Sequence, residues 1–118
     1  MEYSESLKKN KDFQAVFKSK ERKSFANKYL VMYVLKNGSN INRLGISVSK
    51  KVGNSVVRHR ICRLIRESYR LHEKMFDSGL DIVVIARTNA AFVRYFEIES
   101  ALLHLSKLHG IINKEEMK

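Results

Sequence analysis

The stretch RLGISVSKKVGNSVVRHRICRLIRESYR, residues 43–70, decides how the rest of the chain folds. From Leu44 to Ser49, apolar residues alternate with small or polar ones, the period-two pattern of a half-buried strand. A short loop follows, and Asn54 or Ser55 at its end is well suited to cap a helix. The segment therefore predicts a strand, a basic loop and then a long helix.

This predicted helix has two faces of opposite character. At 100° per residue, one apolar stripe is made by Val57, Ile61, Leu64, Ile65 and Ser68. The opposite arc is basic and is made by His59, Arg60, Arg63, Arg66 and Arg70, with Arg58 at its flank. Between Lys50 and Arg70 there are seven lysines and arginines and one acid, Glu67. A solvated helix face usually mixes charges of both signs, so this face indicates a polyanionic partner.

Length and composition narrow the class of protein. A chain of 118 residues is expected to form one domain with a modest core. Its net charge of +11 suits nucleic acid, acidic lipid or an acidic protein. The longest apolar run, residues 82–86, is far short of a membrane helix, and no secretion signal is evident. With the single Cys62 unable to form an internal disulfide, we expect a cytoplasmic protein without membrane contact, with mobile tails at 1–9 and 111–118.

Upstream of the central stretch, the sequence predicts a short helix and a long strand. Asn10 can cap the helix, and Phe13 and Phe17 recur at the spacing of one helical face. Residues 29–35 are β-branched and aromatic and predict a strand, which a short edge strand around residues 24–25 can precede.

The remaining signals complete the predicted fold. Turn residues at 37–40 predict that strand 29–35 pairs antiparallel with strand 44–49. Residues 80–87 are apolar without alternation, which is typical of a strand covered on both faces, and a last helix follows over 96–108. The order is αβββαβα, and the class is an α/β (α+β) two-layer sandwich with three helices on a small mixed four-stranded sheet.

No autonomous catalytic site is evident in the sequence. The acids are scattered, and the pair Glu97 and Glu99 is best interpreted as a solvated first turn of a helix. His59 and Cys62 lie three residues apart, but they lack the two further ligands that zinc needs and the third group that orients a nucleophile. We therefore predict no catalytic residue, no metal site and no cofactor bound by the protein alone.

Nucleic-acid binding agrees better with these residues. The arginine face offers bidentate phosphate donors, and the helix start near Asn54 adds free backbone N–H groups. The alternative is a basic face that is only solvated and binds no partner. Against this, so many arginines on one face repel one another unless a partner compensates their charge. Four aromatic residues leave a second question open, because they fit either a core or a cleft that stacks single-stranded bases: Phe13, Phe17, Tyr29 and Tyr33.

Several segments in the correct order resemble one family. RLGISVSKKVGNSVVRHRICRLIRES is similar to the signature of the bacterial ribonuclease P protein component, in which a strand, Lys-Lys and Gly-Asn precede an Arg-Asn-Arg helix. LKKNKDFQAVF resembles the family's first helix, FANKYLVMYV its central strand and DIVVIAR the strand after the long helix. The resemblance spans about residues 7–110.

The resemblance implies a protein subunit that assists a catalytic RNA. That RNA, with Mg²⁺, removes the 5′ leader of precursor tRNA by metal-assisted hydrolysis, and the protein binds both the RNA and the leader. The family fold also has an uncommon left-handed β-α-β crossover around the long helix, against the general right-handed rule.

Roles for individual residues also follow from the resemblance. It implies that the catalytic RNA is contacted by Lys50, Lys51, Asn54, Arg58, His59, Arg60, Arg63, Arg66 and Arg70. It implies that the leader lies in a cleft lined by Phe13, Phe17 and Tyr33. Two positions depart from the family pattern: His59 stands where asparagine is most common, and Cys62 where lysine or arginine is usual.

Two other functions compete with this one. A non-catalytic protein that binds the ribosome or another structured RNA would share the fold and the charge, and co-purified RNA would separate the two. A DNA-binding regulator that uses residues 55–70 as a recognition helix would need a second helix just before it, whereas the sequence predicts a strand there.

Overall fold

The structure, a computed structural model, describes residues 4–7 and 9–112. Its helices and strands are, in chain order, β1 (Ser4–Ser6), α1 (Asn10–Lys18), β2 (Lys23–Ala26), β3 (Leu30–Lys36), β4 (Asn42–Ser47), α2 (Ser55–His72), β5 (Leu80–Ala86) and α3 (Tyr95–His109). Short 3₁₀ turns, Glu73–Met75 and Thr88–Ala90, follow α2 and β5. Within the described part of the chain, no helix is both long and apolar enough to cross a membrane.

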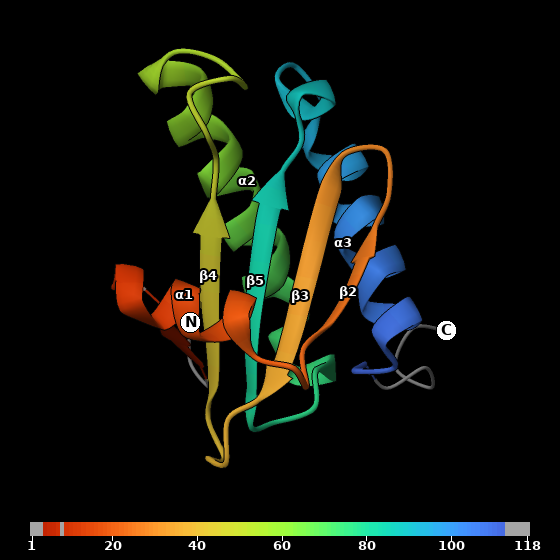
Figure 1. The fold of residues 1–118 in the computed structure, drawn as a ribbon. Coiled ribbons are helices and arrows are strands. Elements are labelled where there is room, and N and C mark those ends of the chain that lie inside the picture. The colour runs from red at the N-terminus through yellow and green to blue at the C-terminus, as the bar shows by residue number, and fades with distance from the viewer. Residues whose placement is uncertain (1–3, 8, 113–118) are drawn as a thin grey trace.

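The five strands form one mixed sheet in the order β1-β4-β5-β3-β2 (Figure 1). The predicted hairpin between residues 29–35 and 44–49 is wrong, because β5 lies between β3 and β4, antiparallel to β3 and parallel to β4. β5 is apolar on both faces and is best covered at the centre of the sheet. The turn after β3 crosses the start of β5 instead of closing a hairpin, and the Asn37 amide donates to the Asp81 carboxylate at 3.0 Å.

A fifth strand, β1, corrects the predicted four-stranded sheet. It pairs in parallel with the outer edge of β4, and the backbone N–H of Leu7 donates to the Leu44 carbonyl at 2.8 Å. Ser4–Ser6 are all polar and show no strand pattern, so the sequence predicts a mobile tail over residues 1–9. In the structure, Leu7 in this segment is buried. At the other end, Ile111 and Ile112 also belong to the core rather than to a tail. Of the two predicted tails, residues 1–3, 8 and 113–118 lie outside the described residues.

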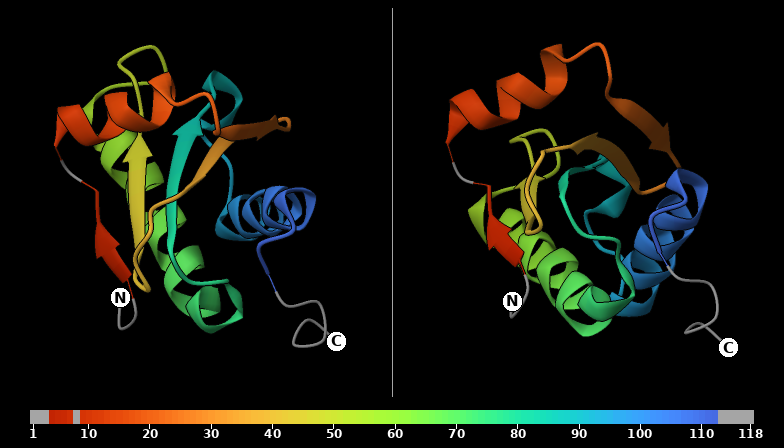
Figure 2. Two further views of the ribbon diagram at one scale, coloured as in Figure 1. Left: turned by 60° about the horizontal axis from the view of Figure 1, so that its bottom comes forward. Right: turned by 90° about the horizontal axis from the view of Figure 1, so that it is seen from below.

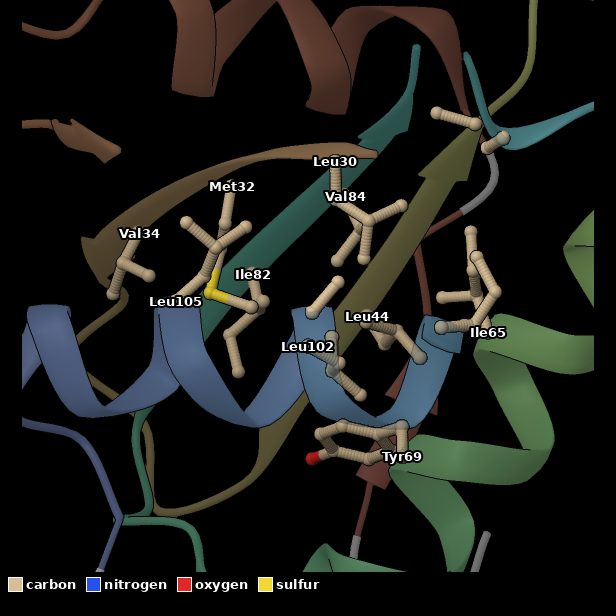
Figure 3. Packing of buried hydrophobic residues seen from close by; sticks show 14 of the residues in the cluster. Leu30, Met32, Val34, Leu44, Ile65, Tyr69, Ile82, Val84, Leu102 and Leu105 are labelled. Carbon is tan, nitrogen blue, oxygen red and sulfur yellow. The ribbon is translucent and has the colours of Figure 1, made fainter. Parts of the chain in front are cut away.

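Helices cover both faces of this sheet (Figure 2). The larger core lies between the sheet and the helices α2 and α3, where Met32, Ile82 and Leu102 are fully buried (Figure 3). On the other face, α1 lies across the sheet, and its Val16 packs on Val83 of β5. The predicted α+β class with three helices is confirmed, and α1 adds a partial third layer to the expected sandwich.

The connection from β4 through α2 to β5 is left-handed. In Figure 1, β4 and β5 run upward in parallel with β5 to the right, and α2 returns behind the sheet. Figure 2 agrees, because it places α2 and α3 on the face opposite α1. This crossover confirms the handedness that the resemblance implied, and it departs from the right-handed rule.

Candidate nucleic-acid interface

The helix α2 is held rigidly at its start and along its buried face. The Asn54 side chain accepts a hydrogen bond from the backbone N–H of Val57 at 3.0 Å, which confirms it as the N-cap. Ile61, Ile65 and Tyr69 are fully buried against the sheet. An anchored helix of this kind can present the charged side chains of its outer face in fixed positions.

Some of the predicted cationic side chains are free to meet a ligand. Lys50, Lys51, His59, Arg63 and Arg66 are exposed, and among the described residues no hydrogen bond or ion pair engages their side chains. They lie in the loop before α2 and along its solvent face. These five side chains therefore form the available part of the predicted basic surface.

Other predicted arginines are bonded within the protein or partly buried. The Arg60 guanidinium donates to the Val93 carbonyl at 2.7 Å and ties α2 to the segment before α3. Arg70 pairs with Glu67 one turn earlier, and this hydrogen bond lowers the pKa of the Glu67 carboxyl. Arg58 is half-buried, and its Nε atom is buried without a partner among the described residues. Charge counting on the sequence could not separate these arginines from the free ones.

Cys62 lies half-buried between Arg58 and Arg66 on α2. Burial raises the pKa of its thiol, and the two arginines only partly oppose this effect. A neutral thiol is a poor nucleophile, which agrees with its interpretation as a boundary residue of the helix. Within residues 4–7 and 9–112, no group of three or more His, Cys, Asp or Glu side chains could hold a metal ion.

The aromatic residues of α1 and β3 are brought together on the other face of the sheet. The rings of Phe13 and Phe17 lie 6.5 Å apart, and Phe17 meets Tyr33 edge-to-face at 5.2 Å. All three are half-buried and pack on a small core that contains Val16 and Val83. Phe13 and Phe17 also line an open hollow of about 390 Å³, together with Asn10, Ile46, Ser47 and Val48. Phe13 and Phe17 are thus partly core and partly open to this hollow, which we call the aromatic cleft, whereas Tyr33 packs on the small core and does not line the hollow.

Tyr29 does not join this group. The sequence placed it on the same strand face as Tyr33, but β3 begins only at Leu30. Residue 29 belongs to the turn before the strand, where alternation does not apply. Its ring instead packs beside α3, and its hydroxyl donates to Glu97 at 3.0 Å.

Two residues that lie against these aromatic rings were missed by sequence reasoning. Gly45 lies under Phe13, and a Cβ atom added there would be only 2.8 Å from the Phe13 ring. A lone glycine inside a strand pattern often marks such a close approach, so a signal for it existed. Arg22 lies over Tyr33, with its guanidinium carbon 5.9 Å from the ring centroid, and no sequence pattern indicated this contact.

The basic surface and the aromatic cleft adjoin at the end of β4. Ile46, Ser47 and Val48 line the cleft, and the chain then runs through Lys50 and Lys51 into α2. In Figure 1 this loop lies at the upper end of the sheet, above both β4 and α2. A single extended polyanion could therefore contact cations and aromatic rings together.

Comparison with known proteins gives a consistent result. A family model described as Ribonuclease P matches residues 1–109. The chain is 66% identical over 113 residues to the "Ribonuclease P protein component" of Lachnoclostridium phytofermentans, covering 96% of each, and 52% identical over 107 residues to that of Alkaliphilus oremlandii, covering 91% and 92%. It also resembles the solved Staphylococcus aureus RNase P protein, with TM-score 0.84, 40% identity and coverage of 93% and 99%. The Thermotoga maritima RNase P protein gives TM-score 0.78, 35% identity and coverage of 87% and 96%.

We expect Gly45→Ala to disturb the aromatic cleft from beneath. The added methyl group would meet the Phe13 ring at 2.8 Å and the Leu7 side chain at 3.0 Å, and overpacking of this kind costs about 1–3 kcal/mol. Urea unfolding should show the loss, and adding Phe13→Ala should make the combined loss smaller than the sum of the two single losses. Additive losses would mean that Phe13 does not press on Gly45.

Proposed function

Because the chain belongs to the ribonuclease P protein family, we propose that it binds the catalytic RNA of the enzyme through α2 and the 5′ leader of precursor tRNA through the aromatic cleft. The RNA and its Mg²⁺ carry out the hydrolysis that releases the leader. This chain contributes positive charge, aromatic stacking surface and a rigid frame. The observation that supports this most directly is the free basic surface of α2 lying next to the aromatic cleft.

The basic surface suits the phosphate backbone of a folded RNA. Exposed Arg63 and Arg66 offer planar donor pairs, and Lys50 and Lys51 add point charges beside the start of the helix. Engaging about six phosphates would give a log–log salt slope of about −4 to −5. Electrostatic contacts of this kind fix position without reading sequence, which is appropriate for docking on one large RNA.

The cleft suits a single strand of RNA. Phe13 and Phe17 keep part of each ring open to the hollow, and every base has a face that can stack on such rings. Ser47 at the rim offers a hydroxyl and Asn10 an amide for sugar or phosphate oxygens. Stacking on aromatic rings tolerates any base sequence. This tolerance is needed because the leader differs from one precursor tRNA to the next.

The central test is reconstitution with the cognate RNA. The purified protein alone should not cleave precursor tRNA, and adding it to the RNA subunit should allow cleavage at a lower Mg²⁺ concentration than the RNA alone needs. Measuring 5′ leader release across a Mg²⁺ titration checks both points. Cleavage by the protein alone would contradict the proposal, and so would an RNA-catalysed reaction whose Mg²⁺ dependence is unchanged when the protein is added. Co-purification with ribosomal RNA would instead favour the non-catalytic alternative.

Two arginines of α2 should respond differently to substitution. Arg63→Ala removes a free cation, so it should weaken binding of the RNA subunit and make the salt slope shallower by about 1, with stability unchanged. Arg60→Ala removes the hydrogen bond to Val93, so it should lower the free energy of unfolding by about 1 kcal/mol. Filter binding at several salt concentrations and urea unfolding provide the two measurements. Identical effects of both changes on both measurements would refute this division of roles.

Phe17→Ala tests the cleft. It should weaken binding of precursor tRNA that carries a leader more than binding of mature tRNA, by about 5- to 50-fold, because one stacking surface is lost. Competition binding of the two tRNAs to the reconstituted enzyme measures the difference. Equal losses for both tRNAs would place Phe17 in the core alone.

A further inference from the structure

A second hollow with aromatic walls lies on the side of the molecule away from α1. It has a volume of about 320 Å³ and lies between α3 and the turn from β2 to β3. Phe96 and His104 contribute from α3, and Lys28 and Tyr29 contribute from the turn. None of these four residues lies in the basic surface or lines the aromatic cleft of the structure.

The walls of this hollow are fixed by hydrogen bonds between the turn and α3. The Asn27 side-chain amide donates to the Ala101 carbonyl at 3.0 Å and to Nδ1 of His104 at 3.2 Å. The Tyr29 hydroxyl donates to Glu97 at 3.0 Å. The hollow is therefore preformed and does not depend on a ligand for its shape.

These contacts also determine which polar atoms face outward. Because Nδ1 of His104 accepts from Asn27, the neutral ring carries its proton on Nε2, which is left as a donor. Glu97 accepts from the Tyr29 hydroxyl and from the Arg94 backbone N–H, and these hydrogen bonds lower its pKa. A carboxylate has lone pairs for a further donor. The hollow thus offers a donor near one end and an acceptor near the other.

Two large aromatic side chains are exposed in this part of the chain, Phe96 in the wall of the hollow and Phe92 in the segment before α3. Phe96 is 60% exposed and Phe92 is 85% exposed. Lys28 and Arg94 are also exposed, with the Lys28 ammonium 5.4 Å from the centroid of the Tyr29 ring, whereas exposed Arg87 donates to the Asn27 carbonyl at 2.9 Å. Exposed rings next to cations are the combination that binds single-stranded nucleic acid, since the rings stack bases and the cations meet phosphates.

The segment before α3 is joined to α2 by a hydrogen bond. The hydrogen bond from Arg60 to the Val93 carbonyl joins α2 to the segment that carries Phe92 and Arg94. In Figure 1 the loop before α2, the turn after β5 and the turn between β2 and β3 all lie at the upper end of the sheet. One RNA bound along α2 would therefore reach the hollow without crossing the aromatic cleft.

We propose that this hollow holds an unpaired base of RNA, stacked on Phe96, with adjacent phosphates on Lys28 and Arg94. The proposal builds on RNA binding by α2 and adds a second single-strand contact at the opposite side of the sheet. A second copy of this chain is a poor occupant, because each copy carries a net charge of +11 and would repel the other.

The chain contains no tryptophan, so Phe96→Trp creates a single fluorescent reporter in the hollow. The probe is a single-stranded RNA of about ten nucleotides, compared with a blunt-ended RNA duplex without unpaired bases. Saturable quenching of the tryptophan by the single strand, and much weaker quenching by the duplex, is expected. Leu108→Trp is the matched control, since Leu108 is 46% exposed on the same helix outside the hollow, and it should not be quenched. Repeating the titration with Phe17→Ala present excludes coupling from the aromatic cleft.

Two outcomes would overturn the proposal. One is equal quenching, or none, at positions 96 and 108. The other is a fluorescence change that follows protein concentration without RNA, which would assign the hollow to another copy of the chain. If the reporter is silent while the RNA subunit still binds with an Arg63-dependent salt slope, the base site fails and the proposed function stands.

A second pair of variants separates stacking from charge. Phe96→Ala should weaken binding of the single-stranded probe by about 5- to 50-fold and leave the salt slope unchanged. Lys28→Ala should make that slope shallower by about 1, because one phosphate contact is lost. Unchanged affinity in Phe96→Ala would rule out a stacked base even if the tryptophan reporter responds.

Discussion

The structure depends on the central position of β5. Residues 80–84 are buried, and alternate side chains serve different layers. Ile82 and Val84 belong to the core beneath α2 and α3, whereas Val83 and Ile85 support α1. The start of the strand is fixed by Asp81, which receives two hydrogen bonds from Arg43 at 2.8 and 2.6 Å. A buried carboxylate needs such partners, so the register of β4 on β5 is tied to this ion pair.

Because one strand supports both layers, the basic helix and the aromatic cleft have a fixed relation. The left-handed crossover sends α2 to the face opposite α1, while the loop that starts α2 leaves β4 at the rim of the cleft. A docking surface and a stacking surface thus share one end of the sheet. The loop at residues 48–54 is the segment that connects the rim of the aromatic cleft to the start of α2.

The positive charge of the chain is divided between structure and binding. Arg43, Arg60 and Arg70 are bonded to groups of the protein itself, whereas Arg63 and Arg66 on α2 face solvent. Exposed lysines also lie on other elements, such as Lys18, Lys36 and Lys107, but on α2 and its preceding loop the unbonded cations are Lys50, Lys51, Arg63 and Arg66. The bonded arginines keep their charge but are held in place, so only the unbonded side chains of α2 can reorient toward a ligand.

The sequence alone determined the elements whose pattern is local: the two faces of α2, a cap at Asn54 or Ser55, a buried strand at residues 80–87 and the class of fold. It could not determine which strands pair, because pairing depends on coverage of β5 by segments far away in the chain. The short β1 and the buried Ile111 and Ile112 were missed because segments of two or three residues are too short to show a periodic pattern. Only the tertiary structure showed that Arg60 is bonded to Val93 while Arg63 is free, and that Tyr29 is bonded to Glu97 away from Tyr33. The physical reason is that these hydrogen-bond partners come from segments distant in the chain.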